Sequence, residues 1–187
     1  MAGKVVILSA PSGSGKTTLA RHLLSVEKLN FKFSVSATTR EKREGEINGK
    51  DYFFFSNKEF NNAIKNKEFI EYEKVYENIF YGTLKSEIDK LILNYNIVFD
   101  VDVIGALSLK KYFKDLATSI FIKPPSLNIL KKRLTDRNKN SNEEIEERVK
   151  KAEIEMKKEN EFDTTIINLD LEIAKEELIN KVEKFLK

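Results

Sequence analysis

Eight residues near the amino terminus have the pattern of a phosphate-binding loop. In order they are Ala10, Pro11, Ser12, Gly13, Ser14, Gly15, Lys16 and Thr17. They match G-x-x-x-x-G-K-[ST] except that alanine replaces the first glycine, which requires only a negative φ at that residue. Backbone N–H groups of such a loop point at phosphate oxygens, the lysine adds a positive charge, and the threonine hydroxyl suits Mg²⁺. We therefore predict that these eight residues bind ATP.

A carboxylate at the end of an apolar strand is expected to hold the magnesium from the other side. Asp100 directly follows the apolar run 97–99, so Thr17 and Asp100 are the predicted metal ligands. Asp102 lies two residues further on, and its side chain faces the same way as that of Asp100 if the strand continues. The alternative is that both are solvated acids at a strand end.

A cluster of hydroxyl groups followed by two arginines lies at residues 34–43. Arg40 and Arg43 are three residues apart, and two guanidinium groups suit a phosphate dianion. From the pattern alone, a solvated basic turn explains this stretch equally well.

Alternating strands and helices must position these groups. Short β-branched or aromatic runs occur at 5–8, 31–35, 97–99, 119–122 and 165–167, and helical patterns separate them. This order predicts an α/β fold of the P-loop NTPase type, three layers with a mainly parallel sheet.

Between residues 40 and 82 the pattern changes to that of a small, half-exposed sheet. Aromatic residues occupy 52–55, and 69–76 alternates apolar with polar residues. A helix over about 57–66 is predicted inside this region, opened by a capping box of Ser56 and Glu59. We interpret the region as an inserted mixed-β subdomain.

Composition narrows the class of protein. The chain has 187 residues, no cysteine and a net charge of +3, which excludes thiol chemistry and gives no bulk field for a nucleic acid or membrane partner. The apolar run at 5–8 is too short for a signal peptide or a membrane span, so a cytoplasmic location is expected.

Several motifs together resemble the guanylate kinase family. Besides the phosphate loop they are the run 34–43, 45–52, 69–71, Tyr81-Gly82 and 100–102, in the order and spacing of that family. The resemblance implies a core of about 1–36, 84–126 and 160–187, a GMP-binding insertion of about 37–83, and a helical lid of about 127–159. It also implies that the chain binds ATP and GMP. We expect a monomer or homodimer, with no nucleic acid and no membrane partner.

The resemblance also implies roles for individual residues. The phosphate of GMP is expected to contact Arg40, Arg43, Tyr52 and Tyr81. The guanine is expected to contact Ser36, Glu71, Thr83 and Asp102. The lid arginines that close on the ATP phosphates are expected to be Arg133, Arg137 and Arg148. The residues expected to act on the transferred group are Lys16, Arg40, Arg43, Arg137 and Arg148.

The expected reaction is transfer of the γ-phosphoryl group of ATP to GMP or dGMP, giving ADP and GDP, with Mg²⁺ bound. No general base is required, because a phosphate with a second pKa of about 6 is already largely ionised at neutral pH. Guanine presents adjacent N–H donors at N1 and N2, which the Glu71 carboxylate can accept, whereas adenine presents an acceptor at N1.

The sequence departs from the family pattern in three places. Ile104 stands where the family usually has glutamine, and residues 137–142 lack its usual Gly-Thr. Residues 168–170 depart from Asn-Asp-Asp, which we expect to affect only a strand-to-helix turn. The details of the lid are the part of the site that these departures affect most.

Four competing functions fit the sequence less well than that of a guanylate kinase. Asp102 and Gly105 fit the Asp-x-x-Gly of a GTPase, but the sequence has no Asn-Lys-x-Asp. A kinase for another nucleoside monophosphate and a non-catalytic peptide-binding module of this family are two more possible functions. The fourth is a nucleic-acid binder that uses the basic residues 131–133.

Overall fold

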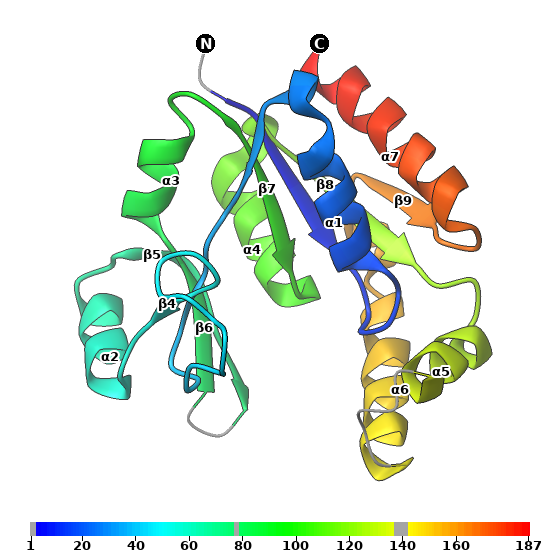
Figure 1. Cartoon of the computed structure of the whole chain (residues 1–187), viewed down its shortest axis with the longest axis horizontal. Helices are drawn as coiled ribbons and strands as arrows, with labels where there is room; N and C mark the ends of the chain where they lie inside the picture. Colours follow the sequence, from blue (N-terminus) through cyan, green and yellow to red (C-terminus); the bar gives the residue numbers. More distant parts are fainter. Residues whose placement is uncertain (1–2, 77–78, 137–141) are drawn as a thin grey trace.

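A five-stranded parallel sheet forms the centre of the molecule (Figure 1). The computed structural model describes residues 3–76, 79–136 and 142–187. The strands in spatial order are β2 (Phe31–Phe33), β7 (Asn96–Val101), β1 (Val5–Ser9), β8 (Ala117–Lys123) and β9 (Thr164–Ile167). Every neighbouring pair is parallel, so the predicted α/β fold is confirmed.

Helices cover both faces of this sheet. Val6 and Leu8 of β1 face the core shared with α1 (Lys16–Ser25) and α7 (Leu171–Leu186). Val5 and Ile7 face the core shared with α3 (Lys85–Leu91) and α4 (Val103–Phe113). All four β1 side chains are completely buried, which explains why this strand is apolar throughout instead of alternating. Short 3₁₀ turns lie at Glu27–Leu29, Lys114–Leu116 and Glu159–Glu161.

A second, mixed sheet lies beyond the β7 side of the first. Its strands in order are β4 (Phe53–Phe54), β3 (Ala37–Thr38), β6 (Ile79–Leu84) and β5 (Phe69–Tyr76). The helix α2 (Asn57–Lys65) covers it, with the Phe60 ring stacked on Phe69 at 4.4 Å. The predicted capping box is present, because Ser56 Oγ accepts from Glu59 N and Glu59 Oε2 accepts from Ser56 N. We call these elements the mixed-sheet lobe.

Two further helices pack on each other on the other side of the central strand. They are α5 (Leu127–Asp136) and α6 (Asn142–Met156), joined by a core that includes Leu130, Leu134, Ile145 and Ala152. In Figure 1 the mixed-sheet lobe and this helix pair extend below the carboxyl end of β1 on its two sides. Among the described residues, no helix has the length and apolar character needed to cross a membrane.

Candidate active site

The phosphate loop connects β1 to α1 and lies at the carboxyl end of the central strand. Gly13 and Gly15 have φ values of 93° and 91°, in the left-handed region that favours glycine. Ala10 is outside that region, as expected of a non-glycine residue at this position. Gly15 directly precedes α1, so the positive end of that helix faces the loop.

Asn168, directly after β9, holds the phosphate loop in place through a side-chain hydrogen bond. Its buried Nδ2 donates to the Ser14 carbonyl oxygen at 2.7 Å, and a Cβ at Gly15 would lie only 2.3 Å from the same nitrogen. Glycine at 15 is therefore required by close approach as well as by φ. Asp170 makes the turn expected there, since its Oδ1 accepts from Glu172 N and Ile173 N at the start of α7. The bracing role of Asn168 was not predicted from the sequence.

Lys16, Thr17 and Asp100 form a compact polar group beside the loop. Lys16 Nζ lies 2.9 Å from Asp100 Oδ1 and also donates to the Val101 carbonyl oxygen. Thr17 Oγ1 donates to Asp100 Oδ2 at 2.8 Å. A cavity of about 340 Å³ opens over this group and the loop. The structure thus brings together the lysine and both predicted metal ligands.

The oxygen atoms of Thr17 and Asp100 fit a magnesium site. Mg²⁺ in kinases is held by one or two protein oxygens, with phosphates and water completing the octahedron. Among the described residues no cluster of three or more acidic, histidine or cysteine side chains could hold a metal without such help. A hydroxyl and a carboxylate 2.8 Å apart are the donor set expected for a metal that arrives with a nucleotide.

Asp102 ends up on the same side as Asp100 although β7 ends at Val101. Asp102 is the N-cap of α4, with extended backbone, and its Oδ1 accepts from Gly105 N at 2.8 Å. Because the backbone stays extended for one residue past the strand, both acids line the same cavities. The strand does not extend to Asp102, yet the two acids line the same cavities.

A second cavity, of about 230 Å³, lies between the mixed-sheet lobe and the end of β7. Its lining residues are Ser36, Tyr52, Glu71, Glu73, Tyr81, Gly82, Asp100, Val101, Asp102, Gly105 and Lys151. Of the four residues expected to contact guanine, Ser36, Glu71 and Asp102 line it. Thr83 is completely buried, and its Oγ1 donates to Glu71 Oε1 at 2.7 Å. Thr83 therefore orients Glu71 and does not face the cavity.

Glu71 is a largely buried carboxylate with no cationic partner within ion-pair distance among the described residues. Burial raises its pKa above the ordinary value, and the hydrogen bond from Thr83 opposes this rise. Asp102 raises the pKa further through its negative charge. Such a group gains most from a ligand that supplies two N–H donors.

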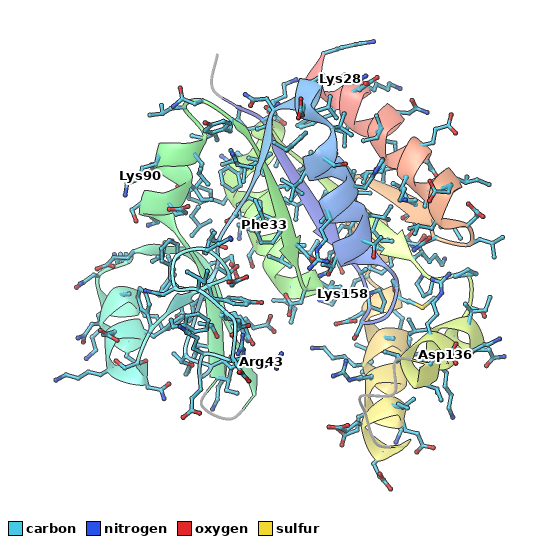
Figure 2. The ribbon with its side chains drawn as sticks, viewed as in Figure 1. Lys28, Phe33, Arg43, Lys90, Asp136 and Lys158 are labelled. Atoms are coloured by element: carbon cyan, nitrogen blue, oxygen red, sulfur yellow. The ribbon has the colours of Figure 1, made fainter. Side chains whose placement is uncertain are left out.

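The two arginines of the lobe differ in their surroundings. Arg40 Nη2 lies 2.7 Å from Glu46 Oε1, and its guanidinium lies over the rings of Tyr52 and Phe54 at 5.3 and 5.8 Å. The hydrogen bond to Glu46 raises the pKa of Arg40. The Arg43 side chain is exposed, and Figure 2 shows it at the edge of the lobe that faces α6. Tyr81 packs edge-on against Tyr52, with centroids 5.9 Å apart.

The three lid arginines reach different places. Arg148, on α6, donates from Nη1 to Ser12 Oγ at 3.0 Å and lines the cavity over the phosphate loop. Arg133, on α5, donates from Nη2 to the Asn168 carbonyl oxygen at 2.9 Å and is not among the residues lining that cavity. Arg137 lies outside the described residues.

Three further charged residues that the sequence patterns did not single out line these cavities. Lys151 and Glu155 follow Arg148 by three and seven residues on α6, which places all three on one helical face. Glu73 follows Glu71 by two residues on β5, which places both on one face of the strand. Helical and strand periodicity applied from Arg148 and Glu71 could have found them.

Comparison with known proteins gives a consistent result. A family model described as guanylate kinase matches residues 2–186. The guanylate kinase of Bacteroides fragilis is 49% identical over 184 residues, covering 98% of this chain and 90% of that protein. The guanylate kinase of Porphyromonas gingivalis is 46% identical, covering 98% of each chain. The crystal structure of guanylate kinase from Anaplasma phagocytophilum superposes with a TM-score of 0.75 at 31% identity, covering 99% of this chain and 87% of that one.

Proposed function

The chain belongs to the guanylate kinase family and phosphorylates GMP with ATP, and from this premise we propose which of its residues carry out the transfer. The observation that carries the proposal is that the two cavities share part of their lining. Asp100, Asp102 and Lys151 line both, so the cavity over the phosphate loop and the cavity beside Glu71 are neighbours. Two nucleotides bound there would meet with their phosphates head to head.

On the donor side, the phosphate loop holds the β- and γ-phosphates of ATP through its backbone N–H groups. Lys16 exchanges its contacts with Asp100 and the Val101 carbonyl for the phosphate oxygens, which are stronger acceptors. Arg148 is already at the loop through Ser12 and supplies a second cation. We assign Arg133 and Arg137 to the same lid.

Mg²⁺ would be held by Thr17 and Asp100, and when bound it neutralises charge on the phosphates and orients them. The pairing of Asp100 with Lys16 keeps this carboxylate in place beside the loop before the nucleotide arrives. ATP with Mg²⁺ is therefore the proposed donor.

On the acceptor side, Glu71 accepts the N1 and N2 hydrogens of guanine while Ser36 and Asp102 contact the base nearby. Thr83 acts by orienting Glu71. Arg40 leaves Glu46 and, with Arg43, Tyr52 and Tyr81, binds the phosphate of GMP. A dianionic phosphate competes well with one carboxylate for a guanidinium. The deoxyribose analogue dGMP presents the same base and phosphate, so we propose it as a second acceptor.

Transfer then depends on positioning and charge neutralisation. A phosphate oxygen of GMP attacks the γ-phosphorus in line, the bond to the β-γ bridging oxygen breaks, and ADP leaves. The nucleophile is already ionised, so no side chain removes a proton. The described residues that neutralise charge are Lys16, Arg40, Arg43 and Arg148.

We also propose that the regions 40–82 and 133–148 close over the two nucleotides when both bind. Closure would exclude water from the transferred group. Small-angle scattering should detect a smaller radius of gyration with ADP and GMP than without them. A cytoplasmic location and a monomer or homodimer stay predictions.

The assignment is tested by the choice of acceptor. Purified protein with ATP and Mg²⁺ is offered GMP, dGMP, AMP, CMP, UMP and dTMP, and ADP formation is measured. We expect turnover with GMP and dGMP and a loss of activity when the metal is chelated. A preference for any other monophosphate would contradict the assignment, and absence of any transfer would favour a non-catalytic module.

A further inference from the structure

Three carboxyl groups line the cavity between the mixed-sheet lobe and β7, where we propose that the guanine binds. Glu71 and Glu73 come from β5, and Asp102 caps α4. Glu71 receives a hydrogen bond from Thr83, and Asp102 receives one from Gly105 N. Glu73 differs, because its Oε2 is buried and makes no hydrogen bond within the described parts of the chain. A buried carboxyl oxygen without a donor needs an explanation.

The space around Asp102 is small and offers it few donors. A Cβ at Gly105 would lie 3.1 Å from Asp102 Oδ1 and 3.4 Å from Glu71 Oε2, so both oxygens border the space that this glycine leaves free. The adjacent residue is Ile104, whose side chain is 53% exposed and has no hydrogen-bonding group. The first turn of α4 therefore gives Asp102 the Gly105 N–H and no side-chain donor at 104.

Three ionised carboxylates in one small cavity repel one another strongly, which favours a proton on one of them. Glu73 and Asp102 line the same two cavities, one beside Glu71 and one bounded by α4 and α6. Burial, together with Asp102, raises the pKa of Glu73 to about 8. At neutral pH Glu73 is thus largely protonated and can donate a hydrogen bond to a neighbouring carboxylate.

We propose that Glu73 is a positioning and specificity residue for the acceptor base, whose protonated carboxyl group donates to Asp102 and holds that carboxylate ready to accept the 2-amino group of guanine. This inference rests on the proposed function. Each carboxylate oxygen can accept more than one hydrogen bond, so Asp102 can serve Gly105, Glu73 and the base together. The expected consequence is selection for GMP over IMP, whose base lacks the 2-amino group.

Charged and titratable groups from several elements line the same cavities as Glu73. They are Glu71 on β5, Tyr52 before β4, Tyr81 on β6, Asp100 on β7, Asp102 at the start of α4, and Lys151, Glu155 and Lys158 on and just after α6. Lys151 favours the ionised form of Glu73, whereas Asp102 and Glu71 disfavour it. Above about pH 8 Glu73 ionises and repels Asp102. The KM for GMP should then rise.

The test compares steady-state kinetics with GMP and with IMP for the native enzyme, Glu73→Ala and Glu73→Gln. Glu176→Gln, an exposed glutamate on α7, is the charge-matched control. At pH 7, Glu73→Ala should raise the KM for GMP about tenfold, with a much smaller change in kcat, and lower the preference for GMP over IMP about tenfold. Glu73→Gln should lose less, because its amide donates the same hydrogen bond.

Measurements from pH 7 to 9.5 separate the proton from the shape of the side chain. The native enzyme and Glu176→Gln should show a rise in KM for GMP centred near pH 8, and Glu73→Gln should lack it. Ionisation of guanine itself affects all variants equally. Circular dichroism and the KM for ATP check that each variant is folded with an intact donor site.

Two results would overturn the inference. One is a GMP-to-IMP preference in Glu73→Ala equal to that of the native enzyme, and the other is a rise in KM centred near pH 8 that persists in Glu73→Gln. Failure of the proposed function would look different, since the native enzyme itself would then fail to phosphorylate GMP.

Discussion

The donor and acceptor sides of the active site are prepared to different degrees. On the donor side, the polar groups already satisfy one another: Lys16 and Thr17 hold Asp100, and Asn168 holds the loop through Ser14. On the acceptor side, Arg40 is paired with Glu46, away from the cavity lining, while Glu71, Glu73 and Asp102 face one another.

The difference follows from what builds each side. Backbone N–H groups and a helix terminus keep their positions without a ligand, so a loop made of them is preorganised for phosphate. Side-chain carboxylates in a small cavity remain poorly compensated until N–H donors arrive. Binding of the guanine therefore completes the acceptor side, whereas ATP enters a donor side that is already formed.

The largest effect should come from removing the charge at the centre of the donor side. Lys16→Ala should lower kcat by about 10³-fold, because one preorganised cation on the transferred group is lost. The exposed Lys90→Ala, on α3, is the matched control. Native-like turnover in Lys16→Ala would remove this residue from the donor site.

The next largest effect should fall on the acceptor side alone. Glu71→Gln turns one acceptor into an N–H₂ donor facing the donors of guanine, so the KM for GMP should rise about 100-fold. The KM for ATP should change little. Glu68→Gln, an exposed glutamate preceding β5, controls for the charge change. Equal losses for both nucleotides would contradict the separation of the two sides.

Removing the Asn168 side chain, which supports the phosphate loop, should weaken ATP binding and leave GMP binding unchanged. Asn168→Ala leaves the Ser14 carbonyl oxygen without its donor and opens space beside Gly15, so the KM for ATP should rise about tenfold. The KM for GMP should be unaffected, and Asn61→Ala, an exposed asparagine on α2, is the control. A rise confined to GMP would show that the brace serves the acceptor side.

The smallest expected effect is on the free energy of unfolding, through the carboxyl group of Glu73. The pKa of Glu73 is raised from 4.5 to about 8, so its stabilising contribution is present below pH 4.5 and is lost as the pH rises through about 8. Glu73→Gln should therefore gain unfolding free energy over the native protein between pH 5 and 9, by about 1 kcal/mol after solvent screening. Urea unfolding at pH 5, 7 and 9 measures this difference, and a constant difference would contradict it.

Much of the fold followed from local patterns in the sequence. The strands at 5–8 and 119–122 are buried on both faces, so they are mostly continuous apolar runs. Such runs can be recognised in the sequence without an alternating pattern. The capping box at Ser56 and Glu59 fixed the start of α2. The end of β7 was harder, because Asp102 keeps an extended backbone while already capping α4.

Contacts between distant segments were the part of the site that local patterns could not supply. Asn168 reaches a loop 154 residues away, and the residues next to it do not indicate this contact. For Lys151, helical periodicity from Arg148 indicates its face of α6 but not the two cavities that it lines. Thr83 illustrates a further limit: the resemblance implied that it contacts guanine, whereas the structure shows a buried hydroxyl that donates to Glu71. The assigned binding roles stay predictions.

The bond between Asn168 and the Ser14 carbonyl oxygen also affects how the chain matures. The phosphate loop is made before the neighbouring strands β7 and β8 and well before Asn168. Nascent or truncated chains that end before β9 lack that support. A nucleotide that binds the loop should therefore stabilise chains that include β9 more than chains that end before it.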